Sequence, residues 1–191
     1  MTSSEIRYDL PDSVVLGQAL GYRFSITFNA RMSGGSIVQD EAHVRQVARL
    51  QTETDADVPI RELITMSMRM RRLIALFAGP PLMPLSWRAK SARVRDDDPD
   101  RAITVDVIRA MPIEDTRDTE IDPHRQILTL RSVESDFPSV VTRYFKHYAT
   151  IAPAIDLLHG TKSSPDQPAE QYFLNVVHAA EAFHRRTDPK P

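Results

Sequence analysis

Three arginines, Arg61, Arg69 and Arg72, recur on one side of a long uninterrupted segment and are the first residues whose chemistry suggests a site. A row of guanidinium groups can follow the phosphate backbone of RNA, because each group donates several hydrogen bonds to an anion. Such a row is more often the solvated face of a helix. The sequence leaves both interpretations open: weak RNA contact or solvated face.

Arg117 and His124 form a second candidate pair, with six residues between them. Some ribonucleases carry an arginine and a histidine at such a spacing on a helix. The intervening residues are typical of a loop and would not hold both side chains on one helical face: Asp118, Glu120, Asp122 and Pro123. We therefore reject the pair as a catalytic motif and keep an RNA-cleaving enzyme based on it as the weakest hypothesis.

Residue spacing predicts no metal and no cofactor. The acidic run Asp96–Asp100 lacks the ligand spacing of a calcium loop and suits a solvated hairpin turn. The six histidines show no HExxH spacing, and the absence of cysteine excludes thiolate sites and disulfides. The glycine-rich phosphate-binding loops and the GxSxG nucleophile turn are also absent from the sequence.

The three arginines belong to the longest stretch without a helix breaker, Val58–Gly79. Its apolar residues recur at helical spacing and predict one buried face: Ile60, Leu63, Ile64, Met70, Ile74 and Phe77. The opposite face carries Thr65 and the arginines. Pro59 suits the first turn of a helix, and Gly79 suits the left-handed residue that ends one. We expect this central helix to pack on the segments before and after it.

Segments that alternate apolar and polar residues predict β-strands on both sides of the central helix. Three precede it: Val14–Leu16, Tyr22–Asn29 and Ala42–Thr52, the last of which also suits a helix. Three more are expected after it: Leu82–Val94, Ile103–Val107 and Gln126–Arg131. Turns or loops are expected at Ser33–Ser36, Asp96–Asp100 and Pro112–Arg125.

The C-terminal part of the sequence predicts helices. Two of them, Phe137–Tyr148 and Ile151–Leu158, are separated near Pro153, and the first has the inner face Val140, Val141, Tyr144 and Tyr148. Gly160–Pro168 is small, polar and proline-bearing, which is typical of a linker. A last amphipathic helix, Ala169–Arg186, carries its apolar residues on one face: Phe173, Val176, Val177, Ala180 and Phe183.

Together these elements predict an α+β fold, in which a small, mostly antiparallel sheet packs with the central helix and C-terminal helices follow. The linker divides the chain into residues 1–160 and 161–191. The net charge of −2 gives no overall attraction to nucleic acid or to a membrane. No apolar run approaches the roughly 20 residues that span a bilayer, and the N-terminus lacks a secretory signal, so we expect a cytoplasmic protein.

The last predicted helix, QYFLNVVHAAEAFHRRT, resembles the opening helix of the HEPN domain in ApeA-type proteins, whose members typically read FLxLxQALExxHRR. The preceding FPSVVTRYFKHYATIAPAIDLLHG is similar to the helical run that leads into that domain. LITMSMRMRRLIALFAGPPLMPLSWRAK is similar to a helix and the following strand of the family's N-terminal domain. The resemblance covers about residues 58–187.

The resemblance implies a bacterial defence protein of the abortive-infection kind, in which an N-terminal α+β domain precedes a helical HEPN ribonuclease domain. HEPN nucleases are similar in using an arginine and a histidine, usually paired across a dimer, to cleave RNA without a metal. That pair lies on a later helix than the one matched here. Only a polar cluster carries over from the family pattern, with a structural role as its equal alternative: Glu181, His184, Arg185 and Arg186.

We therefore expect the N-terminal sensor or regulatory portion of an ApeA-like HEPN anti-phage protein, with the first HEPN helix in residues 161–191 and no catalytic Arg/His pair. RNA would be bound through the missing HEPN part, and a second copy or a protein partner through the C-terminal helix. The alternative is a free-standing α+β protein-interaction module without nuclease activity. An exposed patch formed by Phe173, Val177 and Phe183 would indicate a missing partner or domain.

Overall fold

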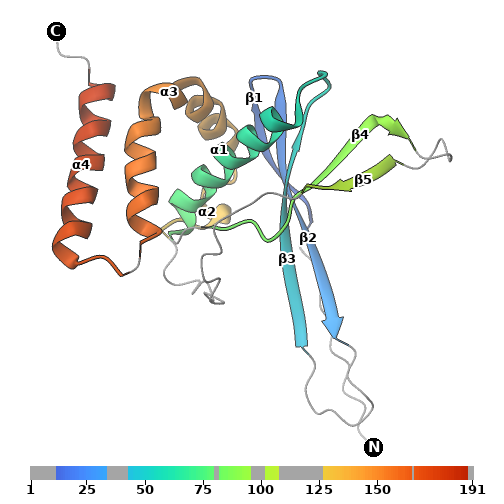
Figure 1. Ribbon diagram of the computed structural model, residues 1–191, viewed down its shortest axis with the longest axis horizontal. Helices are drawn as coiled ribbons and strands as arrows, with labels where there is room; N and C mark the ends of the chain where they lie inside the picture. Colours follow the sequence, from blue (N-terminus) through green and yellow to red (C-terminus); the bar gives the residue numbers. More distant parts are fainter. Residues whose placement is uncertain are drawn as a thin grey trace, which may run out of the picture.

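The computed structural model describes residues 12–33, 43–79, 82–95, 102–107, 127–164 and 166–188. These residues form an α+β fold, as predicted, with a three-stranded antiparallel sheet, a two-stranded sheet and helices (Figure 1). In chain order the elements are β1 (Val14–Ala19), β2 (Tyr22–Ser33), β3 (His43–Glu53), α1 (Ile60–Ala78), β4 (Arg88–Arg95), β5 (Ala102–Asp106), α2 (Leu130–Val133), α3 (Phe137–Lys162) and α4 (Ala169–Thr187). In this described part of the chain, no helix is both long and apolar enough to cross a membrane.

The main sheet has the strand order β1-β2-β3, with β2 paired to both neighbours. Tyr22 and Phe24 are both buried. They are two residues apart on β2, and residues with this spacing point to the same face of a strand. The strand predicted at Ala42–Thr52 is confirmed as β3, and β2 pairs with it over its whole length. Turn residues 34–36 lie outside the described part of the chain.

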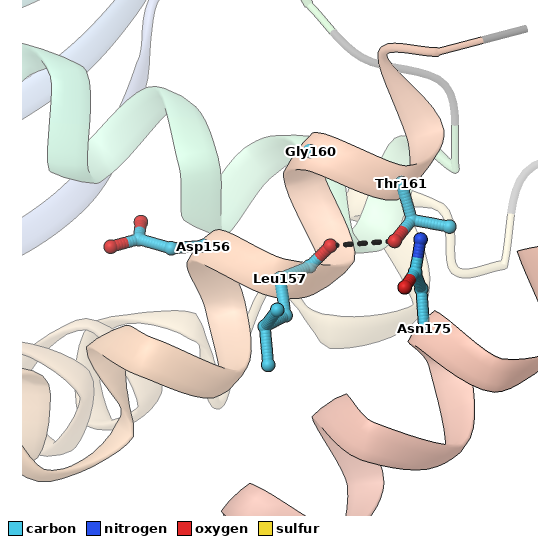
Figure 2. A pocket seen from close by; sticks show the side chains of 5 residues that line it. All are labelled: Asp156, Leu157, Gly160, Thr161 and Asn175. Atoms are coloured by element: carbon cyan, nitrogen blue, oxygen red, sulfur yellow. Dashed lines mark hydrogen bonds between the residues drawn. The ribbon is translucent and has the colours of Figure 1, made fainter. Parts of the chain in front are cut away.

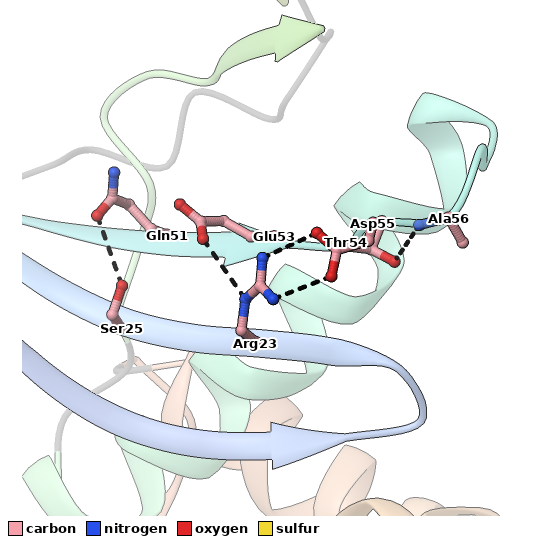
Figure 3. A network of polar contacts seen from close by, with 7 residues as sticks. All are labelled: Arg23, Ser25, Gln51, Glu53, Thr54, Asp55 and Ala56. Atoms are coloured by element: carbon pink, nitrogen blue, oxygen red, sulfur yellow. Dashed lines mark hydrogen bonds and ion pairs between the residues drawn. The ribbon is translucent and has the colours of Figure 1, made fainter. Parts of the chain in front are cut away.

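Two contacts fix the start of α1 against the sheet. The Tyr22 hydroxyl donates a 2.6 Å hydrogen bond to Glu62 in the first turn of α1. Burial and this carboxylate raise the pKa of Tyr22 to about 12. Arg23 donates from both terminal nitrogens to the carboxylate of Asp55, at 3.0 Å each, and also lies 3.8 Å from Glu53 (Figure 3). The segment between β3 and α1 is thereby tied to β2.

The central helix was predicted correctly, but its buried face is rotated from the expected one. The most buried residues of α1 are Met66, Met70, Leu73 and Ala75. Leu63, Ile74 and Phe77 are only partly buried against the core, and Ile60 is exposed. Pro59 is the N-cap rather than a residue of the first turn, and Gly79 is the C-cap with a positive φ of 94°. The apolar residues of α1 cover a wider part of the helix surface than the part that contacts the sheet and α3.

α3 is one helix that contacts β1 and α4, so the break predicted near Pro153 is wrong. The proline lies inside the helix, and α3 changes direction along its length (Figure 1). A proline removes one helical hydrogen bond and kinks a helix without necessarily ending it. The N-terminal half buries Phe137, Val141, Tyr144 and Phe145, and the Phe145 ring stacks on Phe24 at 4.9 Å.

Other boundaries also differ from the sequence expectations. Residues 160–162 belong to α3 rather than to the linker, and β4 begins at Arg88 rather than at Leu82. No strand forms over residues 127–131: the amides of Ile127 and Leu128 instead donate to the Phe77 carbonyl near the end of α1. The next residues begin the short helix α2. The two amides that bind this helix-end carbonyl are therefore not available for strand pairing.

α4 lies beside the C-terminal half of α3, on the side away from the sheet (Figure 1). Ala179 is its one buried residue, and Asn175, Val176 and Ala182 are partly buried. Of the predicted apolar face only Val176 is partly buried, and the other members are exposed: Phe173, Val177, Ala180 and Phe183. Small side chains let two helices approach closely, so α3 and α4 meet through the alanines of α4 and leave its larger apolar residues outside.

Candidate binding groove on the central helix

A groove of about 480 Å³ runs along the outer side of α1 and is closed on one side by α3. We call it the arginine groove, and it is lined by Arg61, Ile64, Thr65, Met68, Arg69, Arg72 and Tyr148. The structure thus brings together all three arginines that the sequence singled out. Ile64 was predicted to face the core but borders the groove. Tyr148 packs against the core, as its predicted inner face implies, and also borders the groove.

Arg72 is held in place by two groups from α3. Its Nη1 lies 2.6 Å from the carboxylate of Asp156 and donates a 2.9 Å hydrogen bond to the hydroxyl of Tyr148. The ion pair is half-exposed, so it adds little to stability, but it fixes the direction of the guanidinium. Asp156 also neutralises most of the charge that Arg72 would bring to the groove.

Arg69 and Arg61 keep their charges. The Arg69 guanidinium carbon lies 4.4 Å above the ring centre of Tyr148, which is a cation–π contact. Arg61 is exposed on the first turns of α1. Within the residues that the structure describes, no carboxylate pairs with either side chain. With Arg72 offset by Asp156, Arg61 and Arg69 are the groove arginines without a carboxylate partner among the described residues.

Two side chains of α3 contact backbone carbonyls of α1 and hold the helix in position beside the groove. Tyr144 donates to the Arg69 carbonyl at 3.0 Å, and burial raises the pKa of this phenol well above its usual range. His159 Nε2 lies 3.3 Å from the Arg72 carbonyl. Burial is the main reason that the pKa of His159 is lowered, and the nearby cations Arg72, Arg71 and Lys162 add to the effect. Tyr144 and His159 both belong to α3, so the packing of α3 on α1 fixes the backbone positions of Arg69 and Arg72.

A second hollow, of about 340 Å³, lies between the end of α3 and α4 (Figure 2). Its polar groups are already satisfied: Thr161 donates to the Leu157 carbonyl at 2.7 Å, and Asn175 accepts a hydrogen bond from Gln171 and donates one to Gln167. Asp156 is its only charged lining residue and is paired with Arg72. This hollow is the weaker candidate for a ligand site.

The polar cluster at the end of α4 is exposed. Arg185 pairs with Glu181 one turn earlier, and His184 lies 3.9 Å from Asp188. Arg186 is likewise exposed in the last turn. These contacts are i,i+4 pairs along a helix surface, which are weak and need no catalytic role. A catalytic role for Glu181, His184, Arg185 and Arg186 remains a prediction.

The larger apolar residues of α4 form an exposed patch, which we call the α4 patch. It consists of Tyr172, Phe173, Leu174, Val177 and Phe183. Phe173 is 66% exposed and Phe183 is 50% exposed. Phe173 and Val177 lie on the side of the helix opposite Asn175 and Ala182, which face α3. Several exposed large apolar side chains on one helix indicate a contact surface.

Two further sequence candidates cannot be placed. Arg117, His124 and the acidic run Asp96–Asp100 lie outside the described residues. Where side chains are described, no three histidine, aspartate or glutamate residues come close enough to hold a metal ion.

Comparison with protein families gives a match over most of the chain. Residues 1–144 of the 191-residue chain match the family described as ApeA N-terminal domain 1. The match includes the main sheet and α1 and ends inside α3, before α4. It confirms the resemblance of the N-terminal part to ApeA-type proteins. Neither a comparison with curated proteins nor one with solved structures gives a match. Because the match spans well over half of its residues, this chain belongs to the ApeA N-terminal domain 1 family.

Proposed function

We propose that this chain is the N-terminal sensor or regulatory portion of an ApeA-like HEPN ribonuclease that acts in anti-phage defence. The observation that carries the proposal is the family match over residues 1–144. The sequence of α4 adds support, because it resembles the first HEPN helix and begins after the matched residues. In this account the catalytic Arg/His pair belongs to later HEPN helices and not to this chain.

The α4 patch fits this role. α4 packs on α3 through Asn175, Val176, Ala179 and Ala182, and its large apolar side chains remain exposed. Exposed apolar side chains along a helix are stabilised when another helix covers them. The occupant that we propose is the remaining helices of the HEPN domain. Movement of α3 relative to the sheet would then be passed to the nuclease through α4.

Phage challenge of bacteria that carry the natural gene and its neighbouring DNA tests this function. The wild-type gene should lower phage plating relative to a deletion strain. The double substitution Phe173→Asp with Phe183→Asp should abolish this protection, because charges in the patch prevent helix packing. Both positions are exposed, so the chain itself should still fold.

The matched control is Leu20→Asp with Leu85→Asp, which places two charges on exposed apolar positions away from α4. This control should protect like wild type. Full protection by the α4 double variant would contradict the proposed contact with HEPN helices. Equal plating on wild-type and deletion strains across the phage panel would contradict the defence role.

A second candidate function is a free-standing protein-interaction module without nuclease activity, and the α4 patch is the observation that favours it. The two functions differ in the fate of RNA in infected cells. A module without an attached nuclease leaves RNA intact, whereas a regulatory portion of a HEPN nuclease controls its cleavage.

A further inference from the structure

The arginine groove is lined by both positively charged and apolar side chains. Arg61, Thr65 and Arg69 are spaced four residues apart, so they stand on successive turns of the same side of α1. Ile64 and Met68 repeat the same spacing one residue earlier and line the groove beside them. A row of cations next to a row of apolar side chains suits a ligand that has an extended anionic part and a flat apolar part.

Two of the three arginines of the groove, Arg69 and Arg72, are oriented before any ligand binds. Tyr148 holds the Arg69 guanidinium by a cation–π contact, and Asp156 and the Tyr148 hydroxyl hold Arg72. A side chain that is already fixed loses less conformational entropy on binding. The Thr65 hydroxyl donates a 2.8 Å hydrogen bond to the Arg61 carbonyl, and Thr65 lines the groove between the two arginines.

The volume of the arginine groove indicates which class of ligand it could bind. A volume of about 480 Å³ lies within the range of roughly 300–1,000 Å³ that is typical of small-molecule sites. Arginine donates several hydrogen bonds in a fixed plane and therefore binds phosphate oxygens in pairs. Arg61 and Arg69 have no carboxylate partner among the described residues and stand two turns apart. They can therefore bind a chain of linked phosphates better than they can bind a single phosphate group.

We propose that the arginine groove binds a nucleoside di- or triphosphate, with the phosphate chain on Arg61 and Arg69 and the base against Ile64 and Met68. This mode of binding uses arginine side chains in place of a glycine-rich loop. The same chemistry occurs at the 5′-triphosphate end of an RNA, so the test must separate a free nucleotide from a nucleic acid end. Binding to the purified chain requires neither phage nor nuclease, so this proposal and the defence role can fail independently.

Isothermal titration of the purified chain with ATP tests the site, in low salt and with EDTA so that the phosphates meet the arginines directly. We expect saturable binding at one site per chain, competition by tripolyphosphate, and no binding of adenosine alone. Arg61→Ala and Arg69→Ala should each weaken binding about tenfold or more, which corresponds to the loss of a charged hydrogen bond. Arg69→Lys, which keeps the charge but loses the planar fork, should fall between wild type and R69A.

Two further variants separate a specific site from general charge attraction. Asp156→Asn releases Arg72 from its ion pair and should tighten ATP binding. Arg143→Ala removes an exposed arginine of α3 that does not line the groove and should bind like wild type. No ATP binding, unchanged binding in R61A and R69A, or equal weakening in R143A would overturn the proposal. Binding of a 5′-triphosphorylated RNA but not of ATP would overturn it in favour of a nucleic acid end.

Discussion

The Phe145 ring of α3 stacks on the Phe24 ring of β2, with 4.9 Å between their centres and 18° between their planes. Both side chains are almost completely buried. Since Phe24 also lies beside the buried residues of α1 in the core, this pair joins the three main elements of the fold.

Phe24→Ala or Phe145→Ala should lower the free energy of unfolding by about 3–5 kcal/mol, because each leaves a cavity in the core. Urea denaturation followed by circular dichroism measures the loss. The exposed Val15→Ala should change stability by less than about 1 kcal/mol. A loss of that small size for F145A would mean that α3 does not pack on the sheet as described.

Two glycines of the β1–β2 region offer a matched pair of substitutions. Gly17 has a φ of +136°, and an added Cβ would lie 2.9 Å from Pro138 Cα in α3. Gly21 has a φ of +81° with open space around it. Gly21→Ala should cost about 1–2 kcal/mol from backbone strain alone. Gly17→Ala should cost clearly more, because β1 and the start of α3 must also separate.

Thermal unfolding of the two glycine variants checks this difference. Equal melting temperatures for G17A and G21A would contradict the close contact between β1 and Pro138.

His159 makes stability depend on pH. Its pKa is lowered in the folded chain, mainly by burial, relative to the ordinary value of 6.5 in the unfolded chain. As pH falls through 6.5, the unfolded state takes up a proton that the folded state accepts only at lower pH. The free energy of unfolding should therefore fall with decreasing pH and level off below the folded pKa.

Urea denaturation at a series of pH values tests the histidine. His159→Gln should flatten this part of the pH dependence. The comparison variant is His147→Gln, which removes an exposed histidine from the same helix. The same pH dependence in H159Q and wild type would show that His159 is not the group responsible.

Lys162 supplies a positive charge to the C-terminal end of α1. Its Nζ donates a 2.8 Å hydrogen bond to the carbonyl of Gly79, the C-cap, while the last turn of α1 has no basic residue of its own. Lys162→Met keeps the aliphatic stem and removes the charge, and should cost about 1 kcal/mol. Lys146→Met, on an exposed part of α3, should be nearly neutral in the same denaturation experiment.

Local patterns in the sequence predicted most of the main elements. The alternation in Tyr22–Asn29 gave β2, and the helical period with Gly79 at its end gave α1. Residues 127–131 were mistaken for a strand because a short apolar alternation cannot show that its amides cap α1. Pro153 was mistaken for a break because tertiary packing holds the two halves of α3 in one helix.

The sequence predicted only the α1 residues of the candidate groove. The arginines share a face of α1 by spacing alone, which local pattern can show. Their partners Tyr148 and Asp156 lie far along the chain on α3, and no local pattern predicts such contacts. The packing of α4 was hidden for a related reason: amphipathicity predicts an apolar face, but it does not show that the helix buries Ala179 and leaves Phe173 and Phe183 exposed.

RNA integrity in phage-infected cells is the most direct test of the claim that this chain regulates a ribonuclease. Total RNA would be compared by sequencing of fragment ends in infected cells that carry the natural gene with its neighbouring DNA, and in infected cells lacking only the coding region of this chain. The account predicts defined RNA cleavage after infection that depends on this chain. Identical RNA end profiles in the two strains during infection that the gene restricts would contradict it.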